Sequence, residues 1–221
     1  MIKDLEYLLK RIFFSEKYLL KKRLIRSIKN NYEKELKIID RYSDISKTAI
    51  DVGVYRGVYT YKLSSLFNKV ICFEPNPLIY TYLKKNLTKI LKNIEIHNYA
   101  LSDKTGSAIL KIPNRRNSIF SKNYEELYRL GAATIHDKNI VENYDSFRVE
   151  TKKLDELVQL NDIGFIKIDV EGHETEVING SIELIKKNKP TLLVEIEEKH
   201  TKKPIEKTIN FIKELGYECF Q

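Results

Sequence analysis

From about residue 48 onward, short apolar runs rich in isoleucine and valine alternate with stretches in which apolar residues recur every three or four positions. The short runs are typical of buried strands and the longer stretches of helices, so the alternation predicts a parallel β-sheet with crossover helices. Strands are expected at residues 48–52, 69–73, 94–100, 163–170 and 190–196. We therefore predict an α/β fold, a mostly parallel sheet flanked by helices.

Helix signals fill the gaps between these strands. Asn76 is a good N-cap residue and Pro77 suits the first helical position, so a helix is expected to start there. Others are expected at about 57–67 and 174–187, and at 204–216, where Gly216 closes the last helix.

The alternation of strand and helix patterns is interrupted between the third and fourth predicted strands. "GSAILKIP" (106–113) and "FRVETKKL" (147–154) look like a strand pair around a polar insertion at about residues 113–146. Long connections in compact domains are commonly functional, so the insertion is a candidate lid facing the substrate; the alternative is an ordinary surface loop.

Residues 1–47 are expected to form a basic helical N-terminal extension. "DLEYLLKRIFF" (4–14), "EKYLLKKRLIRSIKN" (16–30) and "YEKELKIIDRY" (32–42) all have helical spacing. The extension holds 13 Lys/Arg and 7 Asp/Glu, so it carries +6 of the chain's net +8. Such a segment indicates either an anionic partner, such as a peripheral membrane contact, or simply a solvated helical face.

The composition narrows the class of protein. With 42% hydrophobic and 32% charged residues in 221, the chain is long enough for one domain at 48–221 plus the extension. Its two cysteines form no disulfide framework, and no signal peptide or membrane-spanning run is visible, so a cytoplasmic protein is expected. The nearly neutral main domain shows no basic stripe for nucleic acid.

Acidic and small residues follow the predicted strands: Asp51 and Gly53, Glu74, Ser102 and Asp103, Asp169 and Glu171, and Glu195. Ligands of open parallel sheets bind beyond the carboxyl ends of the strands. The acids at these strand ends form an acidic rim, which would repel a pyrophosphate. In addition, Gly53 and Gly57 do not give the G-x-G-x-x-G spacing of dinucleotide sites. The rim suits a cationic sulfonium cofactor with ribose hydroxyls, which predicts S-adenosyl-L-methionine.

The stretches "AIDVGVYRGVYT" (49–60), "ICFEPNP" (71–77), "NYALSD" (98–103), "TKKLDEL" (151–157) and "FIKIDVEGHETEVINGS" (165–181) resemble the FkbM-type methyltransferases. The resemblance covers residues 48–197 and implies a class I (Rossmann-like) methyltransferase fold. It also implies S-adenosylmethionine as the methyl donor and O-methylation of a hydroxyl. The sequence departs from the family at Val54, Tyr55 and Arg56, where a small residue and Asn are expected. Whether the strand pair at the insertion replaces the usual closing strands is left open.

Roles can be assigned to these residues, each with a structural alternative. Cofactor binding is expected from Asp51, Gly53, Gly57, Glu74, Ser102 and Asp103, although the glycines also suit a plain turn and Glu74 a helix start. Asp169, Glu171 and His173 are the catalytic candidates, the last two as general bases, and His173 could instead begin the next helix. Substrate contacts are expected from Arg115, Arg116 and Glu195. No metal is expected, although Asp169, Glu171 and Glu195 match the preference of Mg²⁺.

The favoured hypothesis is an S-adenosylmethionine-dependent O-methyltransferase acting on a hydroxyl, on a sugar of a glycan or glycolipid precursor. Two alternatives stay open: a nicotinamide-dependent oxidoreductase, which the missing glycine fingerprint disfavours, and a non-catalytic interaction domain. The sequence does not indicate an oligomeric state.

Overall fold

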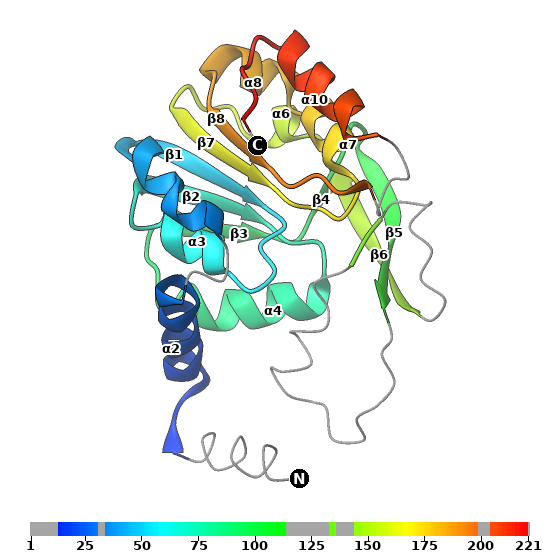
Figure 1. Ribbon diagram of the computed structural model, residues 1–221. Coiled ribbons are helices and arrows are strands. Elements are labelled where there is room, and N and C mark those ends of the chain that lie inside the picture. The colour runs from blue at the N-terminus through cyan, green and yellow to red at the C-terminus, as the bar shows by residue number, and fades with distance from the viewer. Residues whose placement is uncertain (1–12, 31–33, 114–132, 136–143, 199–203, 221) are drawn as a thin grey trace.

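The structure is a computed structural model that describes residues 13–30, 34–113, 133–135, 144–198 and 204–220 (Figure 1). Its centre is a five-stranded sheet in the order β3-β2-β1-β7-β8, with every neighbouring pair parallel. These strands are β1 (Asp44–Val52), β2 (Phe67–Phe73), β3 (Ile94–His97), β7 (Ile163–Ile168) and β8 (Thr191–Val194). The predicted α/β fold with a mostly parallel sheet is therefore confirmed.

Helices cover both faces of this sheet (Figure 1). On one face lie α2 (Glu16–Lys29), α3 (Val58–Leu63) and α4 (Pro77–Asn86), and on the other α6 (Leu154–Leu157), α7 (Glu174–Asn179), α8 (Ile182–Asn188) and α10 (Ile205–Glu214). Successive strand residues point to opposite faces, so Ala49 enters the core under α3 and α4 while Ile50 enters the core under α7 and α8. The strands are consequently apolar on both sides, as buried parallel strands are.

Chain order reverses at β1, which has β2 on one side and β7 on the other. The carboxyl ends of β1 and β7 thus form the switch point where ligands of such sheets bind. Beside it, α4 begins as predicted, with Pro77 in its first turn and the Asn76 side chain accepting a 3.0 Å hydrogen bond from the Leu78 N–H.

A second sheet holds the strand pair predicted around the insertion. β5 (Gly106–Pro113) pairs antiparallel with β6 (Tyr144–Lys152), and β6 pairs parallel with β4 (Ala100–Leu101). This sheet is separate from the five-stranded one, so the strand pair does not extend it beyond β8. The core of the insertion, residues 114–132 and 136–143, lies outside the described residues.

Three predicted elements differ in the structure. The strand predicted at 94–100 is divided into β3 and β4, and between them the Asn98 side chain donates to the carbonyls of Glu74 and Pro75. The helix predicted at 174–187 is divided into α7 and α8 at Gly180.

The helix predicted at 32–42 is, in its described part, two short 3-10 helices, η1 (Lys34–Lys37) and η2 (Ile39–Tyr42). The helix predicted at 4–14 lies outside the described residues except for Phe13 and Phe14. No helix in the described ranges combines the length and the apolarity needed to cross a membrane.

Candidate active site

Asp51, one of the predicted cofactor-binding residues, is fully buried at the carboxyl end of β1. Its Oδ2 atom accepts a 2.5 Å hydrogen bond from the Thr60 hydroxyl on α3. Its Oδ1 atom lies 3.7 Å from Lys167 Nζ and accepts no hydrogen bond from the described residues. Burial raises the pKa of this carboxyl, and Lys167 partly offsets the rise. One oxygen of Asp51 can therefore accept a further hydrogen bond.

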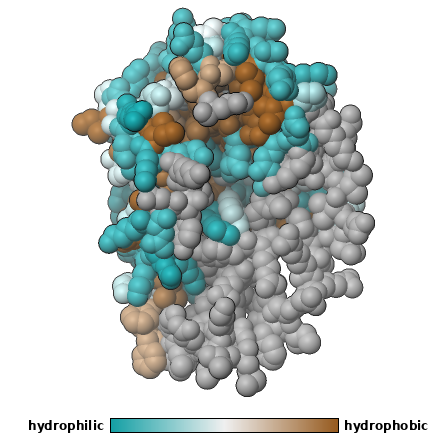
Figure 2. Space-filling model, in the orientation of Figure 1, coloured by the Kyte–Doolittle hydropathy of each residue, from teal (hydrophilic) through white to brown (hydrophobic). Residues whose placement is uncertain are grey.

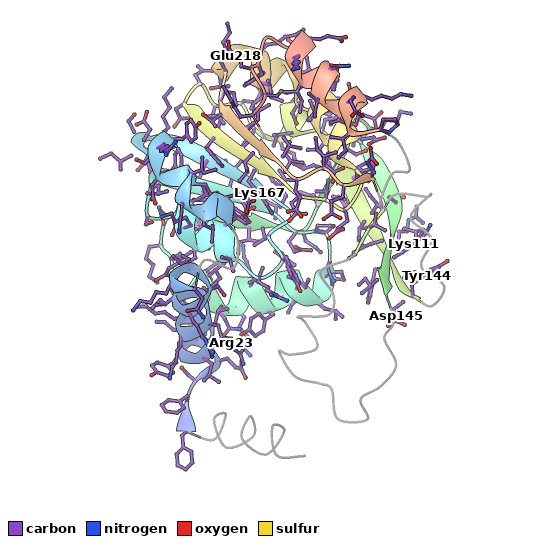
Figure 3. The ribbon with its side chains drawn as sticks, viewed as in Figure 1. Arg23, Lys111, Tyr144, Asp145, Lys167 and Glu218 are labelled. Atoms are coloured by element: carbon purple, nitrogen blue, oxygen red, sulfur yellow. The ribbon has the colours of Figure 1, made fainter. Side chains whose placement is uncertain are left out.

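Lys167 on β7 is a residue that the sequence reasoning missed. The side chain of Lys167, which is labelled in Figure 3, is 4% exposed. Its Nζ atom donates to the Gly53 carbonyl at 2.9 Å and to Asp169 Oδ2 at 3.1 Å. Nζ also lies 4.8 Å from the centroid of the Tyr59 ring, a cation–π contact. A buried ammonium group needs such partners, and the available signal was a lysine within the apolar strand "IGFIKI".

Lys167 also makes the predicted rim less acidic than the sequence indicates. It stands between two of the predicted acids, Asp51 and Asp169, and neutralises one of their two charges when both are ionised. Asp169 is the more accessible of the pair, with 27% of its side chain exposed. The site thus presents a partly open carboxylate that is held in position by a buried cation.

The predicted glycine turn follows β1. At its first glycine, Gly53, the structure shows a close contact with the protein's own backbone. Gly53 has φ +84, and a Cβ there would lie 1.9 Å from the Asp169 carbonyl oxygen. Gly57 has φ +77 at the start of α3, and its Cβ would lie 3.0 Å from Leu87 Cδ2. Glycine is required at Gly53 by its left-handed backbone and by the neighbouring Asp169 carbonyl, and it is favoured at Gly57 chiefly by its left-handed backbone.

Glu74, after β2, joins this turn to the start of α4. Its Oε2 atom accepts from the Tyr55 N–H and its Oε1 atom from the Asn76 N–H, both at 2.9 Å. Burial raises the pKa of Glu74 to about 7, although the two N–H donors favour the charged form. Tyr55 itself has φ +47, an uncommon conformation for a residue with a side chain, and Arg56 lies over its ring at 4.7 Å. Each carboxylate oxygen of Glu74 keeps capacity for a second hydrogen bond.

The sequence predicted that Ser102 and Asp103 follow the third strand of the parallel sheet. In the structure they follow β4, which belongs to the second sheet. Ser102 Oγ lies 2.9 Å from His173 Nε2 and 3.2 Å from Asp103 Oδ1. His173 is the residue before α7, and its Nδ1 lies 3.7 Å from Glu176 Oε2. The structure therefore joins a predicted catalytic residue to a predicted cofactor residue, and His173 links two loops of the site.

The loop between β7 and α7 is braced from two sides. Glu171 and Gly172 have φ +53 and φ +102, and the buried Glu174 carboxylate accepts a 2.9 Å hydrogen bond from the Gly172 N–H. From the insertion, the hydroxyl of Thr134, whose backbone is bridged to Lys111 of β5, donates to the Glu171 carbonyl at 2.9 Å. Non-glycine residues with positive φ concentrate at functional sites. Sequence reasoning missed the bracing roles of Glu174 and Thr134.

The predicted substrate contacts are less defined. Glu195 follows β8, is exposed, and donates its N–H to the Ile168 carbonyl, which places its backbone next to the end of β7. Arg115 and Arg116 lie outside the described residues. Within the described part of the chain, no group of three or more His, Cys, Asp and Glu side chains is placed to hold a metal ion.

Comparisons with known proteins point to one family. The model of the FkbM methyltransferase domain matches residues 51–219. Among solved structures, the chain is similar to methyltransferase FkbM from Methylobacillus flagellatus KT, with 17% identity and a TM-score of 0.52 over 77% of this chain. This chain spans only 37% of that protein, and the likeness supports the fold alone.

Two further solved structures are less similar to this chain, and no conclusion is drawn from them. One is precorrin-6y C5,15-methyltransferase from Geobacter metallireducens GS-15, with 11% identity and a TM-score of 0.46 over 84% of this chain and 72% of that one. The other is a SAM-dependent methyltransferase from Aquifex aeolicus, with 15% identity and a TM-score of 0.45 over 94% and 92%. No curated protein matches the chain.

Proposed function

The chain belongs to the FkbM methyltransferase family, and from that premise we propose that it transfers a methyl group from S-adenosylmethionine to a hydroxyl oxygen on a sugar of a glycan or glycolipid precursor. Dependence on S-adenosylmethionine follows from the family, and the family match favours this activity over an oxidoreductase or a non-catalytic domain. The choice of a hydroxyl acceptor is supported chiefly by Asp169, a partly open carboxylate that Lys167 holds at the switch point.

The residues at the switch point fit this cofactor. The Oδ1 atom of Asp51 accepts no hydrogen bond from the described residues, and because this carboxylate is fully buried, it would bind the amino group of the methionine part through a bridging water. The Glu74 carboxylate can accept from both ribose hydroxyls while its two backbone donors keep it oriented. Ser102 and Asp103, on the loop that His173 holds, would contact the adenine. Carboxylates also suit a cofactor whose reactive centre is a cationic sulfonium.

The reaction is a displacement at carbon. When bound, S-adenosylmethionine supplies an electrophilic methyl group. Asp169 would accept a hydrogen bond from the acceptor hydroxyl, orient its oxygen, and take its proton as the C–O bond forms and the C–S bond breaks. Orientation of this kind lowers the activation barrier by roughly 7–11 kcal/mol. A general base raises the rate by about 10²–10⁴-fold, which corresponds to a smaller lowering of the barrier, so positioning contributes more than proton transfer.

Glu171 and Glu195 would bind other hydroxyls of the acceptor. His173, whose Nε2 lies against Ser102, would act as a positioning residue for the cofactor loop and not as the base.

The direct test is transfer of labelled methyl from S-adenosylmethionine by the full chain to a panel of glycolipid precursors, free glycans and phenols. Label recovered in an O-methyl sugar after acid hydrolysis supports the proposal. Label recovered as a base-labile carboxyl ester or as an N-methyl group contradicts it.

Asp169→Asn keeps the shape of the side chain but removes its negative charge. We expect kcat to fall by roughly 10²–10⁴-fold, because the acceptor hydroxyl loses its proton acceptor. Affinity for S-adenosylhomocysteine should be retained, which isothermal titration would show. Glu183→Gln, the same chemical change at an exposed position of α8, is the matched control and should leave kcat unchanged. Full activity of Asp169→Asn would exclude Asp169 as the base.

Cofactor affinity should depend on the protonation of Glu74. The pKa of about 7 in the free protein means that the carboxyl must lose a proton to accept both ribose hydroxyls. Affinity for S-adenosylhomocysteine should therefore rise with pH, by up to about tenfold per unit below pH 7, and level off above it. Glu74→Gln should bind more weakly and without this slope. A slope that persists in Glu74→Gln would assign the titration to another group.

A further inference from the structure

The outward face of α2 is strongly cationic. All exposed residues of the helix are cations except one tyrosine: Lys17, Tyr18, Lys21, Lys22, Arg26 and Lys29. Glu16 is the one acid in the helix and is turned inward, where its carboxylate lies 3.5 Å from the Tyr82 hydroxyl on α4. The opposite face of α2 packs Leu20 and Leu24 into the main core. The helix is thus firmly attached, with an exposed surface of one sign of charge.

Aromatic rings lie at the start of the same helix. Phe13 is 74% exposed, Phe14 46% and Tyr18 47%, and the rings of Phe14 and Tyr18 stack with centroids 4.9 Å apart. In Figure 1 this end of α2 points away from the two sheets, and in Figure 2 hydrophobic residues occupy the far end of the helix beyond a hydrophilic stretch. Exposed phenylalanines at the tip of a cationic helix are not explained by the core of the domain.

We propose that this surface, Phe13, Phe14 and the outward face of α2, is a peripheral docking site for an anionic lipid bilayer. Charge complementarity identifies the partner, since the lysines and arginine would meet lipid phosphates. The phenylalanines would enter the boundary between headgroups and acyl chains, as in helices that lie in a membrane interface. Each cation near such a surface strengthens binding by about fivefold. The inference goes beyond the proposed methyl transfer and does not depend on its acceptor.

Flotation of the full chain with vesicles tests the proposal. We expect binding to vesicles of phosphatidylcholine mixed with phosphatidylglycerol, weaker binding in high salt, and little binding to pure phosphatidylcholine. Lys21→Glu/Lys22→Glu should weaken binding by more than about 25-fold, because two attractive charges are lost and two repulsive ones are added. Phe13→Ser/Phe14→Ser, which leaves the net charge unchanged, should also release the chain from the vesicles.

Lys186→Glu/Lys187→Glu on α8 is the matched control, since both residues are exposed and the charge change is identical. It should bind vesicles like the unmodified chain, and all variants should keep their melting temperature. Equal loss in the α8 control, or unchanged binding of the α2 variants, would overturn the proposal. So would binding to single-stranded RNA that needs Lys21 and Lys22 in a chain that does not float with anionic vesicles.

Discussion

Lys167→Met is expected to lower the free energy of unfolding by about 3–5 kcal/mol, the usual cost of leaving a buried charge without its partner. Methionine keeps most of the length of the lysine side chain, so the loss is mainly electrostatic. Without the ammonium group, the Gly53 carbonyl loses its 2.9 Å donor, and Asp51 and Asp169 face each other with no cation between them. Guanidinium unfolding monitored by circular dichroism would measure the change.

Lys69→Met is the matched control for that variant. Lys69 also forms an ion pair from a strand, 2.9 Å from Glu95, but its side chain is 37% exposed. An exposed pair contributes about 0–1 kcal/mol, so this variant should unfold almost like the unmodified protein. The double variant Asp51→Asn/Lys167→Met should be less destabilised than the sum of its single changes, because one charge of each sign is removed. Equal effects of Lys167→Met and Lys69→Met would show that the buried cation is not needed.

Gly53→Ala should be the second severe change, with a loss of about 2–5 kcal/mol from left-handed backbone strain and overpacking together. The new Cβ would lie 1.9 Å from the Asp169 carbonyl, so the end of β7 has to move. Because this movement displaces the turn whose Tyr55 N–H orients Glu74, binding of S-adenosylhomocysteine should fall as well. Denaturant unfolding and isothermal titration on the same variant would measure both losses.

Substitutions at two other glycines would separate the backbone cost of Gly53→Ala from its steric cost. Gly216 has φ +91 with nothing within 4 Å of an added Cβ, so Gly216→Ala should show the backbone cost alone, about 1–2 kcal/mol. Gly180 has φ −78, but its Cβ would lie 2.0 Å from the Ser102 carbonyl, so Gly180→Ala should show the steric cost alone. If Gly53→Ala cost no more than Gly216→Ala, the close approach to Asp169 would be unimportant.

Much of the framework could be predicted from the sequence because its signals are local. The apolar runs predict the strands of the parallel sheet, and Asn76 with Pro77 fixes the start of α4 within a few residues of sequence. Because all parallel strands end at the same edge, Asp51, Glu74 and Asp169 could be grouped without any coordinates.

The rest depends on contacts between residues far apart in the chain, which local patterns do not encode. Lys167 reaches the Gly53 carbonyl across 114 positions, and His173 reaches Ser102 across 71. The division of the helix predicted at 174–187 coincides with Gly180, whose neighbour is the Ser102 carbonyl. The spacing of apolar and polar residues along the chain does not indicate any of these long-range contacts.

The separation of the two sheets has a consequence for how this protein can change over time. β5 and β6, the strands on either side of the insertion, belong to the smaller sheet, and among the described residues neither pairs with a strand of the five-stranded sheet. Insertions or deletions there leave the register of β1 against β7 untouched. Length changes in this stretch that keep Thr134 on the Glu171 carbonyl would therefore leave the glycine turn and its carboxylates in place.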